Sequence, residues 1–259
     1  MPLITCSPFE TEPTSPWTLD LATYSRSSTI NFNMTGIKFK SDGLKAIVTR
    51  DSTAVYNFTF GTAWNAATAN AGSTFNTGGT RSQDVYVKPD GTMMWIADDQ
   101  TDKVYEFFMA TPWDVTTAYA GSPAVAEAIT NVYGLDFKPD GTVMYVARFA
   151  GTQYIEQYDL SVAWDITTKS ANGSKTTGTF TTGVKLKDDG TKLFYTDITN
   201  HLVQEMNLSV AWDVTSASNV QTFVTSAFEN SPEGLDFKPD GKRLYVVGSQ
   251  GDDIHEINL

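Results

Sequence analysis

The sequence has little of what metal and redox sites are built from. Its 259 residues include one cysteine, Cys6, and two histidines, His201 and His255. A single cysteine excludes an intramolecular disulfide framework. Neither histidine stands at a ligand spacing from the cysteine or from the other histidine, so a zinc site is not expected. The sequence therefore predicts no metal and no cofactor.

Basic residues are also scarce, with 18 Lys and Arg against 30 Asp and Glu and a formal net charge of −12. Nucleic-acid binding needs clustered cations that neutralise phosphates, so this class of partner is excluded. No stretch approaches the length of a membrane-spanning helix, and the first residues lack the charged start and apolar run of a secretory signal. We therefore expect a protein that is made in the cytoplasm and does not insert into membranes.

The chain does contain a repeat. The dipeptide Asp-Gly recurs five times in a similar setting, at intervals of 48, 50, 49 and 51 residues. The five copies are Asp42-Gly43, Asp90-Gly91, Asp140-Gly141, Asp189-Gly190 and Asp240-Gly241. Self-similarity with this period is typical of solenoids and β-propellers. Only residues that depart from the repeat can then indicate a specific chemistry.

Each repeat predicts four short strands. A strand such as 134–138 leads into the Asp-Gly turn, whose proline and glycine suit a hairpin. The next strand, such as 143–147, is apolar throughout, as expected of a strand covered on both faces. A third strand, such as 155–160, alternates between apolar and polar residues, which indicates one wet face. A tryptophan and a stretch rich in Thr, Ser and Ala follow and supply the outermost strand.

The two ends of the chain predict a closed ring. The fifth repeat stops at Leu259 before its tryptophan, and the missing piece, with Trp17, stands near the N-terminus. Closure also removes the sheet edges that an open array has to protect. We predict an all-β, five-bladed β-propeller with four-stranded antiparallel blades, in which a single domain spans 15–259 and 15–34 completes the blade formed by 231–259. Residues 1–14 are expected to form an N-terminal arm.

Motifs of known catalytic sites are absent, and two departures from the repeat are binding candidates. There is no Gly-x-Ser-x-Gly elbow, phosphate-binding glycine loop or His-Glu-x-x-His pair. Asp84 stands where the other repeats have glycine, and we expect it to face the central channel as a solvated carboxylate, with ligand or ion binding as the alternative. Glu233 precedes the matching glycine of the fifth repeat and is the second candidate.

The loops between the second and third strands vary most between repeats, and we expect all of them on the face opposite the Asp-Gly hairpins. Loops on a rigid scaffold usually carry recognition residues. Phe149 is an apolar side chain in a polar loop, where an anchor or sugar-stacking role and a position tucked under the loop are equal alternatives. Ca²⁺ binding by the acidic loops stays an open alternative, although none of them matches a known Ca²⁺ loop pattern. The candidate binding residues of these loops are Arg50, Asp51, Asp98, Asp99, Asp102, Arg148, Phe149, Asp197, His201, Asp252 and Asp253.

Two stretches carry a resemblance to known repeats. Gly-Leu-Asp-Phe-Lys-Pro-Asp-Gly-Thr-Val-Met-Tyr-Val at 134–146 and Tyr-Asp-Leu-Ser-Val-Ala-Trp-Asp-Ile-Thr-Thr at 158–168 are similar to repeats in propeller-like proteins of bacteriophages and marine bacteria. The similarity covers nearly all of 36–259. In phages such repeats belong to virion, fibre or decoration proteins.

The resemblance implies a non-enzymatic structural or adhesion component of a bacteriophage virion, in the tail, a fibre or the capsid decoration. Such a propeller docks on other virion or surface proteins, and a host-surface glycan and a second copy of the chain are further candidate partners. The expected location is the virion. One alternative is a lectin-like propeller whose glycan pockets repeat between blades. A second alternative is a propeller hydrolase, either a glycosidase or a lactonase.

Overall fold

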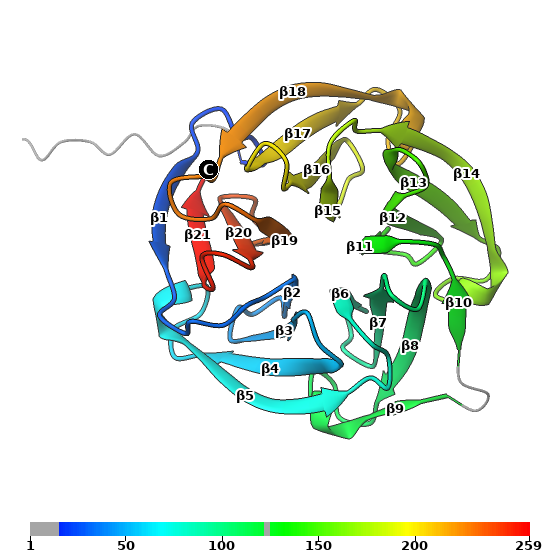
Figure 1. Cartoon of the computed structure of the whole chain (residues 1–259), viewed down its shortest axis with the longest axis horizontal. Coiled ribbons are helices and arrows are strands. Elements are labelled where there is room, and N and C mark those ends of the chain that lie inside the picture. Colours follow the sequence, from blue (N-terminus) through cyan, green and yellow to red (C-terminus); the bar gives the residue numbers. More distant parts are fainter. Residues whose placement is uncertain (1–15, 122–124) are drawn as a thin grey trace, which may run out of the picture.

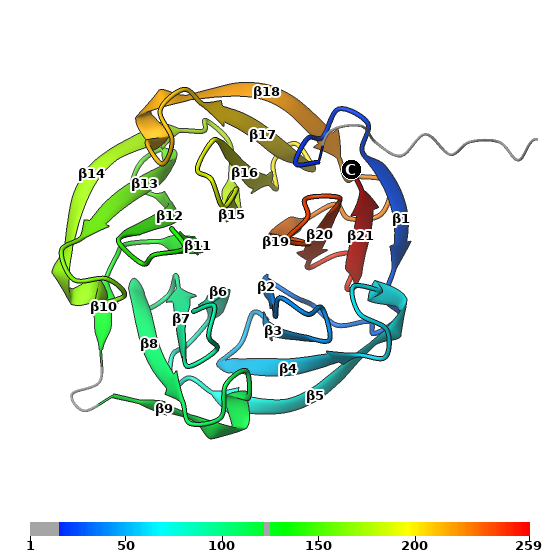
Figure 2. The ribbon, with the colours of Figure 1, turned by 180° about the vertical axis from the view of Figure 1, so that it is seen from behind.

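The structure, a computed structural model, describes residues 16–121 and 125–259. The predicted N-terminal arm, with Cys6, lies outside the described residues. Five antiparallel sheets stand around a central axis as the blades of a propeller (Figure 1, and from behind in Figure 2). The predicted five-bladed fold is confirmed.

Within each blade the strands run from the axis outward. The first blade contains β2 (Gly36–Phe39), β3 (Lys45–Thr49), β4 (Ala54–Phe60) and β5 (Ala69–Asn76). The second contains β6 (Ser82–Val87), β7 (Met93–Asp98) and β8 (Lys103–Met109), and two short strands, β9 (Ala118–Ala120) and β10 (Ala126–Ala128), share its outer edge. The third contains β11 (Val132–Phe137), β12 (Val143–Phe149), β13 (Gln153–Leu160) and β14 (Lys169–Thr176). The fourth contains β15 (Thr181–Leu186), β16 (Lys192–Asp197), β17 (Leu202–Leu208) and β18 (Ala217–Val224). The fifth contains β19 (Pro232–Phe237), β20 (Arg243–Gly248), β21 (Ile254–Asn258) and, from the N-terminal side, β1 (Thr23–Ser27).

The Asp-Gly turns are hairpins, as the sequence predicts. In the third blade Gly141 has a φ of 74°, a left-handed conformation that glycine adopts without steric cost. Asp140 Oδ1 accepts a hydrogen bond from Thr142 N at 2.9 Å, and Asp140 Oδ2 pairs with Lys138 Nζ at 2.8 Å. The same Lys–Asp pair forms in every blade, as Lys40–Asp42, Lys88–Asp90, Lys138–Asp140, Lys187–Asp189 and Lys238–Asp240. These repeated carboxylates are therefore engaged by the turns.

The repeated tryptophans close the same turns. Trp164 N donates to Gly141 O at 2.9 Å, and a Cβ added at Gly141 would stand 2.3 Å from the indole ring. The indole and the glycine are thus in direct contact, which explains why both residues recur in every repeat. The five pairs are Gly43–Trp64, Gly91–Trp113, Gly141–Trp164, Gly190–Trp212 and Gly241–Trp17.

In the first four blades the outermost strand is preceded by a single turn of 3₁₀ helix. In the third blade the side chain of Asp165, the residue after the repeated tryptophan, caps this turn by accepting from Thr167 N at 3.0 Å. The four turns are η1 (Ala66–Thr68), η2 (Val115–Thr117), η3 (Ile166–Thr168) and η4 (Val214–Ser216). Across residues 16–121 and 125–259, no helix is long and apolar enough to cross a membrane.

The N-terminal strand closes the ring. β1 pairs antiparallel with β21, with Thr23 opposite Asn258. Ile254 N donates to Ser28 Oγ at 2.9 Å just beyond this pairing. Figure 1 shows β1 as the outermost strand of the blade that ends at the C-terminus. The predicted closure by the N-terminal strand is confirmed, whereas the exact domain limits stay a prediction.

The hydrophobic core lies between neighbouring blades. Trp95 of β7 and Tyr145 of β12 are completely buried. The rings of Trp95 and Phe137, which come from the second and third blades, have centroids 4.8 Å apart. Packing of this kind fixes each blade against the next one, so the positions of side chains near the axis are set rigidly.

Candidate functional site

The propeller axis carries two cavities, one at each end. The loop-face cavity, of about 370 Å³, opens among the loops between second and third strands. The hairpin-face cavity, of about 190 Å³, opens among the Asp-Gly hairpins. Between them the free volume falls to about 10 Å³. This waist is at the limit for holding a single water, so the two cavities are separate sites.

Charged side chains from the innermost strands close the waist. Lys38 Nζ pairs with Asp236 Oδ1 at 3.2 Å, which links the first and fifth blades. Lys185 Nζ pairs with Asp136 Oδ1 at 3.1 Å, which links the fourth and third blades. Burial by itself lowers the pKa of Lys185, but the facing carboxylates of Asp136 and Asp236 outweigh it and raise that pKa. The waist therefore holds paired charges.

Asp84 lies on β6 beside this waist and is 6% exposed. Its Oδ2 accepts from Leu135 N of the third blade at 2.9 Å, and its Oδ1 accepts from Val85 N at 2.8 Å. Burial raises the pKa of Asp84. A Cβ on Gly36 would stand 2.3 Å from Asp84 Oδ1, so the glycine of the first blade makes room for this carboxyl. Asp84 is buried between blades, whereas the sequence predicts a solvated carboxylate.

The loop-face cavity is lined mainly by polar side chains. Tyr133 and Phe180 form an aromatic wall, with ring centroids 5.0 Å apart in an edge-to-face arrangement. Four lining residues occupy the position just before the repeated glycine, or before Asp84, in successive innermost strands: Gln83, Tyr133, Thr182 and Glu233. The loops and blade connections add Asn33, Asp51, Arg81, Phe180, Ile198, Ser249 and Gln250.

Glu233 is the buried carboxyl of this cavity, with 9% of its surface exposed. Ser231 Oγ donates to Glu233 Oε1 at 3.5 Å. Burial raises the pKa of Glu233 to about 7, and the negative charges of Asp51 and Glu229 act in the same direction. A carboxyl with this pKa can both accept and return a proton near neutral pH.

Glu229 binds backbone N–H groups close to Glu233. It is 1% exposed, and its Oε1 accepts from Ser231 N at 2.7 Å. Its Oε2 accepts from Gly251 N at 2.8 Å. One buried carboxylate thus ties together the two loops on either side of Glu233. A site supported in this way keeps its geometry.

Arg81 is the cation of the loop-face cavity. Its Nε donates to Asp99 Oδ1 at 2.7 Å, and its Nη2 contacts Asp99 Oδ2, so the pair is bidentate. Asp51 Oδ1 lies 3.4 Å from the same Nε. The hydrogen bond with Asp99 raises the pKa of Arg81, which stays charged. Within the described residues, Nη1 makes no hydrogen bond, which leaves two N–H donors for a ligand.

The structure brings Asp51 and Asp99 together at Arg81 and places Glu233 in the lining of the same cavity, whereas it uses the other predicted loop carboxylates to hold loops and blade connections. Asp98 Oδ2 accepts from Thr80 N at 2.6 Å. Asp253 Oδ1 accepts from Ile30 N at 3.1 Å. In the same way Asp102 Oδ1 binds the backbone N–H of Asn131, and Asp197 Oδ1 binds that of Asn200. These carboxylates hold loops in place.

The remaining predicted loop residues lie outside the cavity lining. The guanidinium of Arg50 stacks 4.4 Å from the centroid of the Phe32 ring. Arg148 Nη1 pairs with Glu156 Oε2 at 3.1 Å, and Phe149 is 39% exposed. His201 and Asp252 have left-handed backbone conformations; the imidazole of His201 contacts Asn230 O, and Asp252 O accepts from Phe32 N at 2.6 Å. Binding by these residues stays a prediction.

Several cavity residues are missed by the sequence argument for identifiable reasons. The residue before the repeated glycine varies between blades, and only Glu233 among these is selected from sequence, although Gln83 and Tyr133 occupy the same position. Arg81 gives no such signal because it lies in the connection between two blades. In the part of the chain that the structure describes, no group of three or more His, Cys, Asp or Glu could hold a metal ion.

No protein-family model matches the chain, and no curated protein matches its sequence. Many solved structures share its fold, among them two Bacteroides proteins. A "putative 6-phosphogluconolactonase" from Bacteroides uniformis superimposes with a TM-score of 0.52 at 14% identity, over 86% of this chain and 66% of that protein. A protein of the same description from Bacteroides fragilis gives a TM-score of 0.54 at 15% identity, over 82% of this chain and 76% of that protein. At such identity the likeness shows the fold alone.

These neighbours overturn the predicted role. Both are described as lactonases, which contradicts the prediction of a non-enzymatic virion component. The physical reason for the error is that the repeated residues form hairpins and blade contacts, which unrelated propellers need equally. A resemblance at such residues therefore indicates the blade structure and carries no information on function. The predicted partners and virion location rest on that resemblance and stay predictions.

Proposed function

We propose that the protein hydrolyses a neutral lactone in the loop-face cavity, with Glu233 as the general base. The observation that carries this proposal is a buried carboxyl and a guanidinium lining one cavity of about 370 Å³. That volume lies in the range of small-molecule sites. The description of the two Bacteroides proteins as lactonases supports the reaction class.

The reaction needs a general base, a group that stabilises negative charge on the carbonyl oxygen, and a proton for the leaving alkoxide. Ionised Glu233 takes a proton from a water molecule while the water oxygen attacks the ester carbonyl carbon. The carbonyl oxygen then gains negative charge, which the free Nη1 N–H groups of Arg81 stabilise. The ring C–O bond breaks, and protonated Glu233 returns its proton to the leaving alkoxide. One water is consumed, one hydroxy acid forms, and Glu233 is ionised again.

The charges of the cavity favour an uncharged substrate. Arg81 is the only cation among the described lining residues, and Asp99 and Asp51 already neutralise it. A phosphate group would be repelled by these carboxylates and would find no unpaired cation in the cavity, so its binding is disfavoured. We therefore expect an unphosphorylated lactone to be a better substrate than 6-phosphogluconolactone.

The uncharged lining suits a polyhydroxylated ring. Asn33, Gln83 and Gln250 each carry an amide, which both donates and accepts hydrogen bonds. Tyr133 and Phe180 supply an aromatic wall on the same cavity. Sugar hydroxyls can pair with the amides while the apolar side of the ring packs on the wall. An aldonolactone combines these features with a cyclic ester.

Proton release from δ-gluconolactone at pH 7 tests the proposal, with five- and six-membered lactones and their phosphorylated forms as further substrates. We expect wild-type hydrolysis above the spontaneous rate, and a loss in kcat of roughly 10²- to 10⁴-fold for Glu233→Gln. Glu127→Gln is the matched control, because it removes a carboxylate that pairs with Lys169 at the blade edge. Full activity of Glu233→Gln, or no hydrolysis of any lactone, would overturn the proposal.

A further inference from the structure

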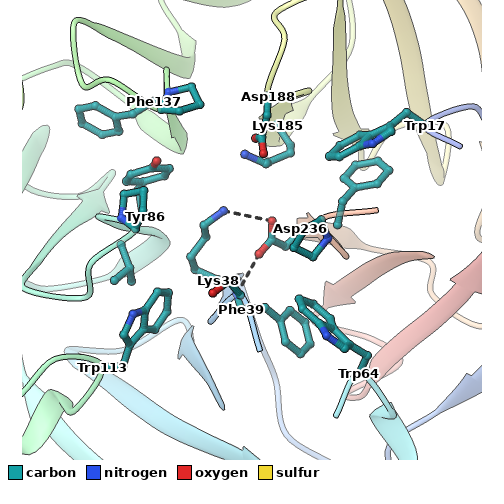
Figure 3. A pocket seen from close by; sticks show the side chains of 16 residues that line it. Trp17, Lys38, Phe39, Trp64, Tyr86, Trp113, Phe137, Lys185, Asp188 and Asp236 are labelled. Atoms are coloured by element: carbon teal, nitrogen blue, oxygen red, sulfur yellow. Dashed lines mark hydrogen bonds and ion pairs between the residues drawn. The ribbon is translucent and has the colours of Figure 1, made fainter. Parts of the chain in front are cut away.

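The hairpin-face cavity takes no part in this reaction, yet it is built like a binding site. Its walls are aromatic, with Trp17, Trp64 and Trp113 around it, and its floor carries Lys38, Lys185 and Asp236. Figure 3 shows Lys38 reaching across the floor toward Asp236, with the tryptophans around the periphery. The closed waist means that a ligand can enter only from the hairpin face.

We propose that the hairpin-face cavity binds one neutral sugar ring, at a site separate from the loop-face cavity. It is a single axial site, unlike pockets that repeat between blades. The lining uses the tryptophans of the fifth, first and second blades but neither Trp164 nor Trp212. The equivalent position of the innermost strand is Lys38, Tyr86, Lys185 and Asp236 in the first, second, fourth and fifth blades, so the site lacks five-fold symmetry.

The floor offers hydrogen-bond donors and acceptors side by side. The ammonium of Lys38 has three N–H donors, and one bonds to Asp236 Oδ1 at 3.2 Å. Within the described residues it makes no second hydrogen bond. Asp236 Oδ2 accepts from Phe39 N at 2.8 Å, so each carboxylate oxygen keeps a free lone pair. Vicinal hydroxyl groups, which donate and accept at once, match such a floor.

The charge balance selects a neutral ligand. Each floor lysine is paired with one carboxylate, Lys38 with Asp236 and Lys185 with Asp136. An anion would find no uncompensated cation there, and Asp188 at the rim adds a negative charge. A cation would meet the ammonium of Lys38, which already lies 5.3 Å from the centroid of the Tyr86 ring. A polar ligand without net charge avoids both unfavourable electrostatic interactions.

Size and wall chemistry restrict the ligand further. A cavity of about 190 Å³ has the volume of about six water molecules, which suits one ring but no longer chain. Indole and phenol rings present flat apolar faces, on which the C–H side of a pyranose packs while its hydroxyls reach the floor. Three prolines at the rim, Pro89, Pro139 and Pro239, complete an apolar entrance.

Titration with methyl glucoside, methyl galactoside and methyl mannoside tests this inference. Intrinsic tryptophan fluorescence and saturation-transfer NMR should show saturable binding of at least one of them at one site per chain. Ser41 is exposed at the rim, and Ser41→Trp should weaken that binding at least tenfold by filling the entrance. Ser249→Trp fills the other cavity and is the matched control, expected to leave sugar binding unchanged.

A second variant keeps the inference testable if Ser41→Trp does not fold. Lys38→Met combined with Asp236→Asn removes one ion pair of the floor, leaves Lys185 paired with Asp136, and should also abolish binding. Absence of saturable binding to wild type, unchanged binding to Ser41→Trp, or tighter binding of methyl glucuronide than of the neutral sugars would overturn the inference. Lactone hydrolysis measured on the same proteins separates the two proposals, because Ser249→Trp should lose hydrolysis and Ser41→Trp should keep it.

Discussion

Trp17 and Gly241 form, across the seam of the ring, the contact that the other tryptophans form within one continuous repeat. Trp17 N donates to Gly241 O at 2.8 Å. A Cβ added at Gly241 would stand 2.0 Å from the indole of Trp17. In the uninterrupted third blade Trp164 N donates to Gly141 O at 2.9 Å. The seam is therefore packed as closely as an ordinary blade.

Replacing Trp17 with alanine should destabilise the whole propeller. Trp17 is 7% exposed and stacks on Phe237, with ring centroids 4.8 Å apart, so its removal leaves a large cavity. We expect the free energy of unfolding to fall by about 3–5 kcal/mol in urea denaturation. Trp164→Ala is the matched control and should cost a similar amount. A cost below about 1 kcal/mol for Trp17→Ala alone would show that the seam contributes little.

Arg81→Lys should impair turnover more than substrate binding. Lysine keeps the positive charge but cannot form the bidentate pair with Asp99, so the cation loses its fixed position. If Arg81 stabilises the developing oxyanion, kcat should fall by roughly 10²-fold with little change in KM. Steady-state kinetics on a lactone measure both values. Arg26→Lys at the outer strand β1 is the control, and a loss confined to KM for Arg81→Lys would assign the arginine to binding only.

The pH dependence of lactone hydrolysis should report Glu233. The base must be ionised, and the pKa of Glu233 is raised to about 7 by burial and by the charges of Asp51 and Glu229. The value of kcat/KM should therefore rise tenfold per pH unit below about 7 and level off above it. Glu229→Gln removes one negative charge, so its profile should shift to lower pH. A profile that does not move in this variant would contradict the electrostatic role of Glu229.

Glu233→Gln should stabilise the protein at alkaline pH. The pKa of Glu233 is raised by burial from 4.5 to about 7 on folding, so the folded state binds more protons between these values. The free energy of unfolding therefore falls as pH rises through this window, and the penalty is complete above pH 7. Relative to wild type, the variant should gain up to about 3 kcal/mol at pH 8 and nearly nothing at pH 4. Equal gains at both pH values would show that charge burial is not the cause.

The sequence by itself determined the architecture. The Asp-Gly turns and the tryptophans are local features, and Gly141 and Trp164 meet within one repeat whatever the rest of the chain does. The interrupted fifth repeat likewise required Trp17 to meet Gly241. For this reason the blade number, the strand order and the closure could be predicted from one chain.

Only the tertiary structure decided which departures from the repeat come together. Arg81 lies between the first and second blades and Glu233 in the fifth, and they share a cavity because the ring brings the inner strand ends to one axis. Asp84 is buried because Gly36 of a neighbouring blade has no Cβ, a fact of close approach that spacing along the chain does not contain. A repeat fixes contacts between residues that lie a constant number of positions apart in the sequence. Side chains around the axis come from different blades, and the curvature of the closed ring of sheets sets which of them meet.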